Sequence, residues 1–101
     1  MTTMKLFGMR NLNHAIEYAR SGGQALHVMD HSGGVYRDAP ECFRRTKMFA
    51  HLFDQDLARL TRTARRLGVR IVKVSREGQP GQHVDLCGRP MRRAISECEA
   101  E

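Results

Sequence analysis

Four acidic and imidazole side chains at the ends of predicted strands are the residues best suited to chemistry. They are Asp30, His51, His83 and Asp85. Asp30 and His51 each come near the end of a short apolar segment, and ligands of open α/β sheets bind beyond the carboxyl ends of strands. His83 and Asp85 are two residues apart, so they share one face of a strand. If residues 75–82 return the chain as a hairpin, we expect all four residues to meet at one edge. Such a cluster suits a divalent metal or acid–base catalysis.

The same four residues also have an ordinary structural interpretation. A histidine at a strand end is usually a partly buried hydrogen-bonding residue, and an aspartate beside a turn usually caps it. The chain has no compact zinc motif such as His-Glu-x-x-His and no glycine-rich phosphate loop. Whether the protein is an enzyme therefore stays open at this level.

A second candidate site is a basic surface. The formal net charge is +6, and only three of the 17 basic residues are lysines. Arginine favours bidentate contacts with phosphate. The arginines on two predicted helices are Arg59, Arg62, Arg65, Arg66, Arg89, Arg92 and Arg93. If both helices cover one face of the sheet, these side chains form a strip that suits nucleic acid or another anionic ligand. The alternative is the charged outer face that any surface helix carries.

The stretch that must position these residues is a helix that follows His51. Apolar residues recur there at helical spacing, which predicts a stripe facing a core. The stripe consists of Phe53, Leu57, Leu60, Ala64 and Leu67. Asp54 is the predicted N-cap, Asp56 adds negative charge to the first turn, and Gly68 is placed to end the helix.

The remaining pattern predicts an α/β fold. Strands are expected over residues 24–30, 48–53, 69–74 and 83–86, and further helices from about 11 to 20, from within 38–41, and from 88. Strand, helix and strand joined closely over 48–74 predict a parallel pair. We therefore expect a single domain over residues 1–101, as a two-layer or three-layer sandwich. Its mixed, mostly parallel sheet would have three to five strands, and about four helices would flank the sheet. Residues 1–10 are expected to form a loose arm, with a short irregular strand around Leu6 and Phe7 as the alternative, and residues 99–101 a frayed acidic tail.

Composition narrows the setting of the protein. Three widely spaced cysteines, Cys42, Cys87 and Cys98, argue against a disulfide scaffold and a structural zinc site, so we expect free thiols. No apolar run approaches the length of a membrane span, which favours a cytoplasmic protein without a membrane partner. An exposed sheet edge favours a homodimer.

The chain resembles a family of small bacterial proteins of unknown function. The resemblance rests on three motifs over about residues 25–96 and is strongest at 51–70. They are His51-Leu-Phe-Asp-Gln55 at the place of a His-Leu-x-x-Asp motif, Arg-Leu-Gly at the end of the following helix, and His83-Val-Asp-Leu at the place of His-Tyr-Asp. It implies the α/β fold and the choice of polar residues, but it implies no activity. Binding of a phosphate-containing ligand or nucleic acid is thus the leading hypothesis. A metal-assisted hydrolase or phosphoesterase is the rival, and a protein-interaction module is the third possibility.

Overall fold

The computed structural model describes residues 4–30, 42–43 and 47–100, with the last two residues described by their backbone alone. These residues form six strands, three α-helices and one turn of 3-10 helix. The strands are β1 (Met4–Phe7), β2 (Gln24–Asp30), β3 (Met48–Phe53), β4 (Val74–Ser75), β5 (His83–Leu86) and β6 (Glu99–Ala100). The helices are η1 (Met9–Asn11), α1 (Leu12–Arg20), α3 (Leu57–Leu67) and α4 (Gly88–Glu97).

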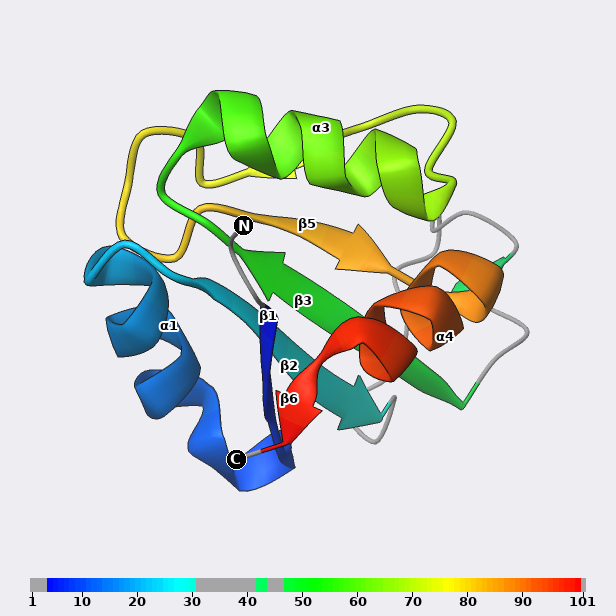
Figure 1. The fold of residues 1–101 in the computed structure, drawn as a ribbon, viewed down its shortest axis with the longest axis horizontal. Helices are drawn as coiled ribbons and strands as arrows, with labels where there is room; N and C mark the ends of the chain where they lie inside the picture. The colour runs from blue at the N-terminus through cyan, green and yellow to red at the C-terminus, as the bar shows by residue number, and fades with distance from the viewer. Residues whose placement is uncertain (1–3, 31–41, 44–46, 101) are drawn as a thin grey trace.

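All six strands belong to one sheet in the order β4-β5-β3-β2-β1-β6 (Figure 1). β1 is parallel to both β2 and β6, whereas β2–β3, β3–β5 and β5–β4 are antiparallel. The predicted α/β class and mixed sheet are confirmed, but the expectation of a mostly parallel sheet of three to five strands was wrong. β3 and β4 are not neighbours either, because the β4–β5 hairpin inserts β5 between them.

The sheet is the middle of three layers. Figure 1 shows α3 and α4 together on one side of the sheet and α1 on the other. Leu60, Ala64 and Leu67 of α3 and Met91 and Ala94 of α4 pack in the larger core cluster with one face of the sheet. The smaller cluster joins α1 to the opposite face through Ala15, Ala19, Phe7, Ala25 and Phe53. About four helices were expected, whereas the described residues contain three α-helices; the helix predicted to start within 38–41 lies outside them.

The helix predicted after His51 is present as α3, and its end at Gly68 is confirmed. Gly68 adopts φ 108°, the left-handed conformation that glycine adopts without strain, and its N–H donates to the carbonyl of Arg65. The predicted N-cap was wrong by two residues. Asp56 is the N-cap and accepts a hydrogen bond from the Arg59 N–H, while Asp54 accepts one from the Asp56 N–H at 2.9 Å. Asp54 thus organises the turn that precedes the helix.

The predicted strand over 69–74 was wrong in extent, since only residues 74–75 pair with β5. Val69 and Val72 instead pack on the core from a loop, and Ile71 is 76% exposed. Their β-branched side chains satisfy a strand pattern, but the chain pairs with β5 only from Val74 onward, so Val69 and Val72 reach the core from a loop. None of the helices in the described part of the chain is both long and apolar enough to cross a bilayer.

Three further expectations differ from the structure. Met4–Phe7 forms β1 in place of a loose arm, which confirms the alternative of a short strand around Leu6 and Phe7, and Glu99–Ala100 forms β6 within the expected frayed tail. β1 is held by its pairing with both β2 and β6, and β6 is held by its pairing with β1. Cys42 and Cys87 form a disulfide with a Cα–Cα distance of 6.2 Å, while Cys98 stays free as predicted. The fold brings together two cysteines that are 45 residues apart, and sequence spacing does not reveal such a contact.

Candidate metal centre

Two neighbouring antiparallel strands bring three of the four predicted polar residues together. In the β3–β5 register, His51 lies opposite Asp85 and Phe53 lies opposite His83. Side chains alternate along a strand, so His51, His83 and Asp85 all project from one face of the sheet. This is the face that α1 covers in part, as Phe53 belongs to the α1 cluster.

The three side chains converge on a single point. Nε2 of His51 is 3.7 Å from Oδ1 of Asp85, and Nε2 of His83 is 3.4 Å from the same oxygen. One ligand atom from each residue lies within 4.8 Å of the others. The two imidazoles are 18% and 14% exposed and the Asp85 side chain is 40% exposed, so the cluster is reachable from solvent on the side of the carboxylate.

The ring orientation of His83 is set by a backbone hydrogen bond. Its Nδ1 lies 2.7 Å from the carbonyl oxygen of Gly81, and a carbonyl only accepts, so Nδ1 carries a proton. In neutral His83 the lone pair is therefore on Nε2, directed at Asp85. A metal-binding histidine commonly donates its other ring nitrogen in this way.

A second hydrogen-bonded chain sets the orientation of His51. Nε2 of His27 lies 3.1 Å from the carbonyl of Met9 and donates to it, which leaves Nδ1 of neutral His27 as an acceptor. Nδ1 of His51 lies 3.3 Å from that atom and donates to it. The two rings are stacked, with centroids 5.5 Å apart. The lone pair of His51 is consequently on Nε2, which also faces Asp85.

With both rings neutral, Nε2 of His51, Nε2 of His83 and Oδ1 of Asp85 are all hydrogen-bond acceptors that face one another. Oδ1 of Asp85 is buried yet has no hydrogen bond of standard geometry from the described residues. Burial and, to a smaller extent, the nearby His83 and His27 rings lower the pKa of His51, the Asp85 carboxylate opposes them, and the resulting pKa is about 4. Burial also lowers the pKa of His83, but the Asp85 carboxylate and the Gly81 carbonyl outweigh it and raise the pKa overall. The cluster therefore favours a positive species at its centre, either a proton on His83 or a cation.

The fourth predicted residue, Asp30, lies apart from this group. It ends β2 opposite Met48, three positions beyond His27, so strand alternation places it on the other face of the sheet. His27 takes its place, because it pairs directly with His51 across β2 and β3. From the sequence, His27 was not predicted to belong to the cluster. His27 and Asp30 are three residues apart and therefore lie on opposite faces of β2, but only the β2–β3 pairing shows that His27 is the one on the face of His51.

The predicted arginines divide into two groups. Arg59 donates from Nε and Nη2 to the carboxylate of Asp54, both at 2.7 Å, and also from Nη2 to the Gly22 carbonyl at 2.9 Å. The other six side chains are exposed: Arg62, Arg65, Arg66, Arg89, Arg92 and Arg93. They lie on α3 and α4, which share a face of the sheet, and Arg66 joins the helices through two 2.8 Å contacts with Glu97. These six arginines, called the arginine face below, lie on the side of the sheet opposite the histidine cluster, which consists of His51, His83 and Asp85.

Comparison with protein-family models, with curated proteins and with solved structures finds no match to this chain. What the protein does is therefore inferred from its own residues and their geometry.

Proposed function

We propose that the protein is a metal-dependent hydrolase that binds one divalent ion through His51, His83 and Asp85. The observation that carries this proposal is the convergence of two imidazole Nε2 atoms on a buried carboxylate oxygen that accepts no hydrogen bond of standard geometry from the described residues. When both imidazoles are neutral, the carboxylate oxygen and the two nitrogen lone pairs repel one another at 3.4 and 3.7 Å, and a bound cation removes that repulsion.

The ligand set also suggests the kind of ion and its chemistry. Two imidazoles and one carboxylate suit Zn²⁺, and the same set with open positions suits Fe²⁺. Three protein ligands leave a coordination position for water, and a bound divalent ion lowers the pKa of that water and polarises an ester. In hydrolysis the water oxygen bonds to the ester centre, the ester bond breaks, and the leaving alcohol takes the proton.

The outer shell supports the same interpretation. Both ligating histidines donate their Nδ1 protons, His83 to Gly81 and His51 to His27, so neither ring has to turn before it binds an ion. His27 is held in turn by the Met9 carbonyl in η1. A site that is already oriented loses little conformational freedom when it binds.

Titration with Co²⁺, followed by its visible absorption, tests this proposal, with Zn²⁺ as the competitor. We expect one equivalent to bind to the intact protein. His83→Gln, His51→Gln and Asp85→Asn should each weaken binding by more than the roughly 10- to 100-fold loss typical of an outer-shell change, and His27→Gln should fall within that range. His14 is exposed on α1, so His14→Gln is the matched control and should bind normally.

Circular dichroism of each variant separates loss of metal binding from loss of fold. The proposal is wrong if the folded wild-type protein binds no divalent ion, or if the three ligand variants bind it as well as His14→Gln does. If the protein prefers Fe²⁺ to Zn²⁺ under anaerobic conditions, the hydrolase proposal is wrong and the same residues would instead hold an iron site for oxidative chemistry.

We propose the arginine face as a second function, the binding of nucleic acid or another polyanion. The specific observation in its favour is that α3 and α4 cover one face of the sheet, as the strip requires. Removing Arg65 and Arg92 together should weaken nucleic-acid binding and reduce its salt dependence. Absence of any retardation at low salt would contradict this second proposal.

A further inference from the structure

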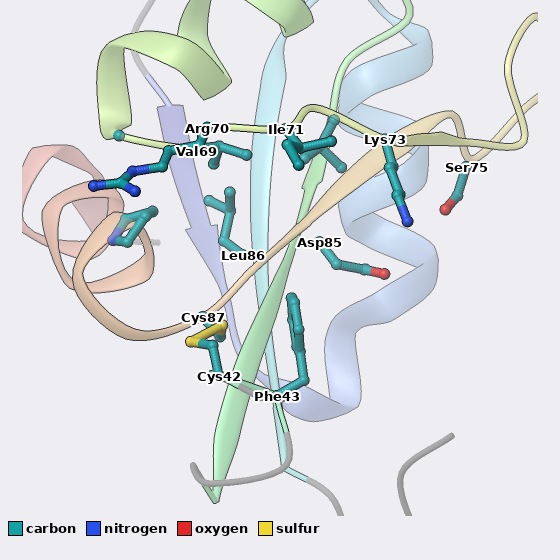
Figure 2. Close-up of a pocket in the computed structure, with 13 residues that line it drawn as sticks. Cys42, Phe43, Val69, Arg70, Ile71, Lys73, Ser75, Asp85, Leu86 and Cys87 are labelled. Carbon is teal, nitrogen blue, oxygen red and sulfur yellow. A yellow bond between two sulfur atoms is a disulfide. The ribbon is translucent and has the colours of Figure 1, made fainter. Parts of the chain in front are cut away.

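A groove of about 640 Å³ lies beside the proposed metal centre, at the outer edge of β5. Figure 2 shows it between the loop that follows α3 and the Cys42–Cys87 disulfide. Asp85 lines this groove and also belongs to the histidine cluster, so the two features share a residue. The volume is within the range of roughly 300 to 1,000 Å³ that is usual for small-molecule sites.

The groove exists because β4 is short. β4 pairs with β5 only at Val74–Val84 and Ser75–His83, and the preceding loop over 69–73 leaves the sheet edge. Apolar side chains then form most of the walls: Phe43, Val69, Ile71, Leu86 and Pro90. Ile71 is 76% exposed at the rim, so its side chain can contact an apolar ligand in the groove.

Polar groups gather at the end of the groove that adjoins the metal centre. Ser75 pairs with His83 across β4 and β5, and Lys73 directly precedes β4 and lines the groove together with Ser75 and Asp85. Figure 2 shows the polar ends of Lys73, Ser75 and Asp85 on one side of the groove, while Arg70 points to the other end. Lys73 is exposed and makes no ion pair with another described residue, so its ammonium group is available to an anionic ligand.

We propose that this groove selects phosphate esters of apolar or aromatic alcohols as the substrate class. The inference rests on the proposed metal-dependent hydrolysis. The phosphate lies between the metal centre and the Lys73 ammonium, and the alcohol part occupies the apolar groove. Hydrolysis forms a bond from the water oxygen to phosphorus, breaks the P–O bond to the alcohol and gives the proton to that alcohol. The products are inorganic phosphate and a free apolar alcohol.

Calorimetric titration of the full chain in the presence of Zn²⁺ tests this substrate class, with 1-naphthyl phosphate, inorganic phosphate and 1-naphthol as probes. We expect 1-naphthyl phosphate to bind about tenfold or more tightly than inorganic phosphate, because only the ester buries apolar area in the groove. Lys73→Met should weaken both phosphate-containing probes by about tenfold. Ile71→Gln should weaken 1-naphthyl phosphate and 1-naphthol and leave inorganic phosphate unchanged. Arg20→Met removes the same charge from an exposed side chain of α1 that does not line the groove, and it should change none of these affinities.

Two results would overturn the inference. One is equal binding of inorganic phosphate and 1-naphthyl phosphate, and the other is a Lys73→Met effect no larger than that of Arg20→Met. A parallel Zn²⁺ titration of the same samples tells the two proposals apart. If Zn²⁺ binds but the ester preference is absent, only the substrate class is wrong. If the wild-type protein binds no Zn²⁺, the proposed function fails and the substrate class fails with it.

Discussion

Replacing Arg59 by methionine should destabilise the fold strongly, because it leaves a buried carboxylate without its cation. Asp54 is completely buried and accepts hydrogen bonds from Nε and Nη2 of Arg59, both at 2.7 Å. The Asp56 N–H and the Gln24 side-chain amide each donate a further bond at 2.9 Å. Methionine keeps much of the aliphatic stem of arginine and removes the whole guanidinium group.

The size of the effect follows from the burial of this pair. Removing one partner of a buried ion pair costs about 3 to 5 kcal/mol, since the remaining charge is desolvated and uncompensated. Arg59 is itself 21% exposed, so water reaches the vacated position and we expect the lower end, about 3 kcal/mol. For a domain of this size, that loss lowers the melting temperature by roughly 12 to 24 °C.

Urea unfolding followed by circular dichroism measures this loss, with Arg62→Met as the control. Arg62 is exposed one turn along the same helix, and its replacement should change the unfolding free energy by about 0.5 kcal/mol or less. The double variant Asp54→Asn with Arg59→Met should recover part of the stability, because the unpaired charge is gone. If Arg59→Met is within about 1 kcal/mol of Arg62→Met, the buried ion pair does not stabilise the protein as argued.

Two other predictions concern the disulfide and the histidines. Replacing Cys42 and Cys87 by serine should lower the unfolding free energy by about 2 to 4 kcal/mol, as expected for a closed loop of this length; equal stability of variant and oxidised wild type would contradict it. After treatment with EDTA, His51 should make the protein less stable as the pH falls from about 6.5 to about 4, because its folded pKa is about 4 and the unfolded chain binds more protons in that window. His83 acts with the opposite sign: its folded pKa is raised, so its contribution is present at low pH and is lost as the pH rises through that value. Urea unfolding of His51→Gln and His83→Gln at several pH values checks both signs, and an unchanged acid response in His51→Gln would refute the first.

The part of the fold that sequence predicts best is the part determined by local periodicity. The α3 stripe places Leu60, Ala64 and Leu67 in the core, and Gly68 ends the helix at the predicted residue. The N-cap was misplaced because Asp54 and Asp56 both have a carboxylate that can cap a helix. The carboxylate of Asp54 is engaged by the Gln24 side chain and by the Asp56 N–H, which leaves Asp56 as the cap.

Only the part of the candidate site that follows from the alternation of side chains within one strand was predictable from the sequence. His83 and Asp85 share a face because they are two residues apart, and the β4–β5 hairpin brings them beside His51. Asp30 and His27 required the antiparallel β2–β3 register, which depends on long-range pairing that single residues do not encode. The groove was not predictable at all, since it results from how few residues of β4 pair with β5.

The most direct test of the metal centre is nitrogen NMR of the histidine side chains during a Zn²⁺ titration. The geometry predicts that Nε2 of His51 and His83 move to the shifts of metal-bound nitrogen at one equivalent, while both Nδ1 atoms stay protonated. The resonances of His14 should not move. Coordination through Nδ1, or no change at His51 and His83 when Zn²⁺ is added, would contradict the proposed centre.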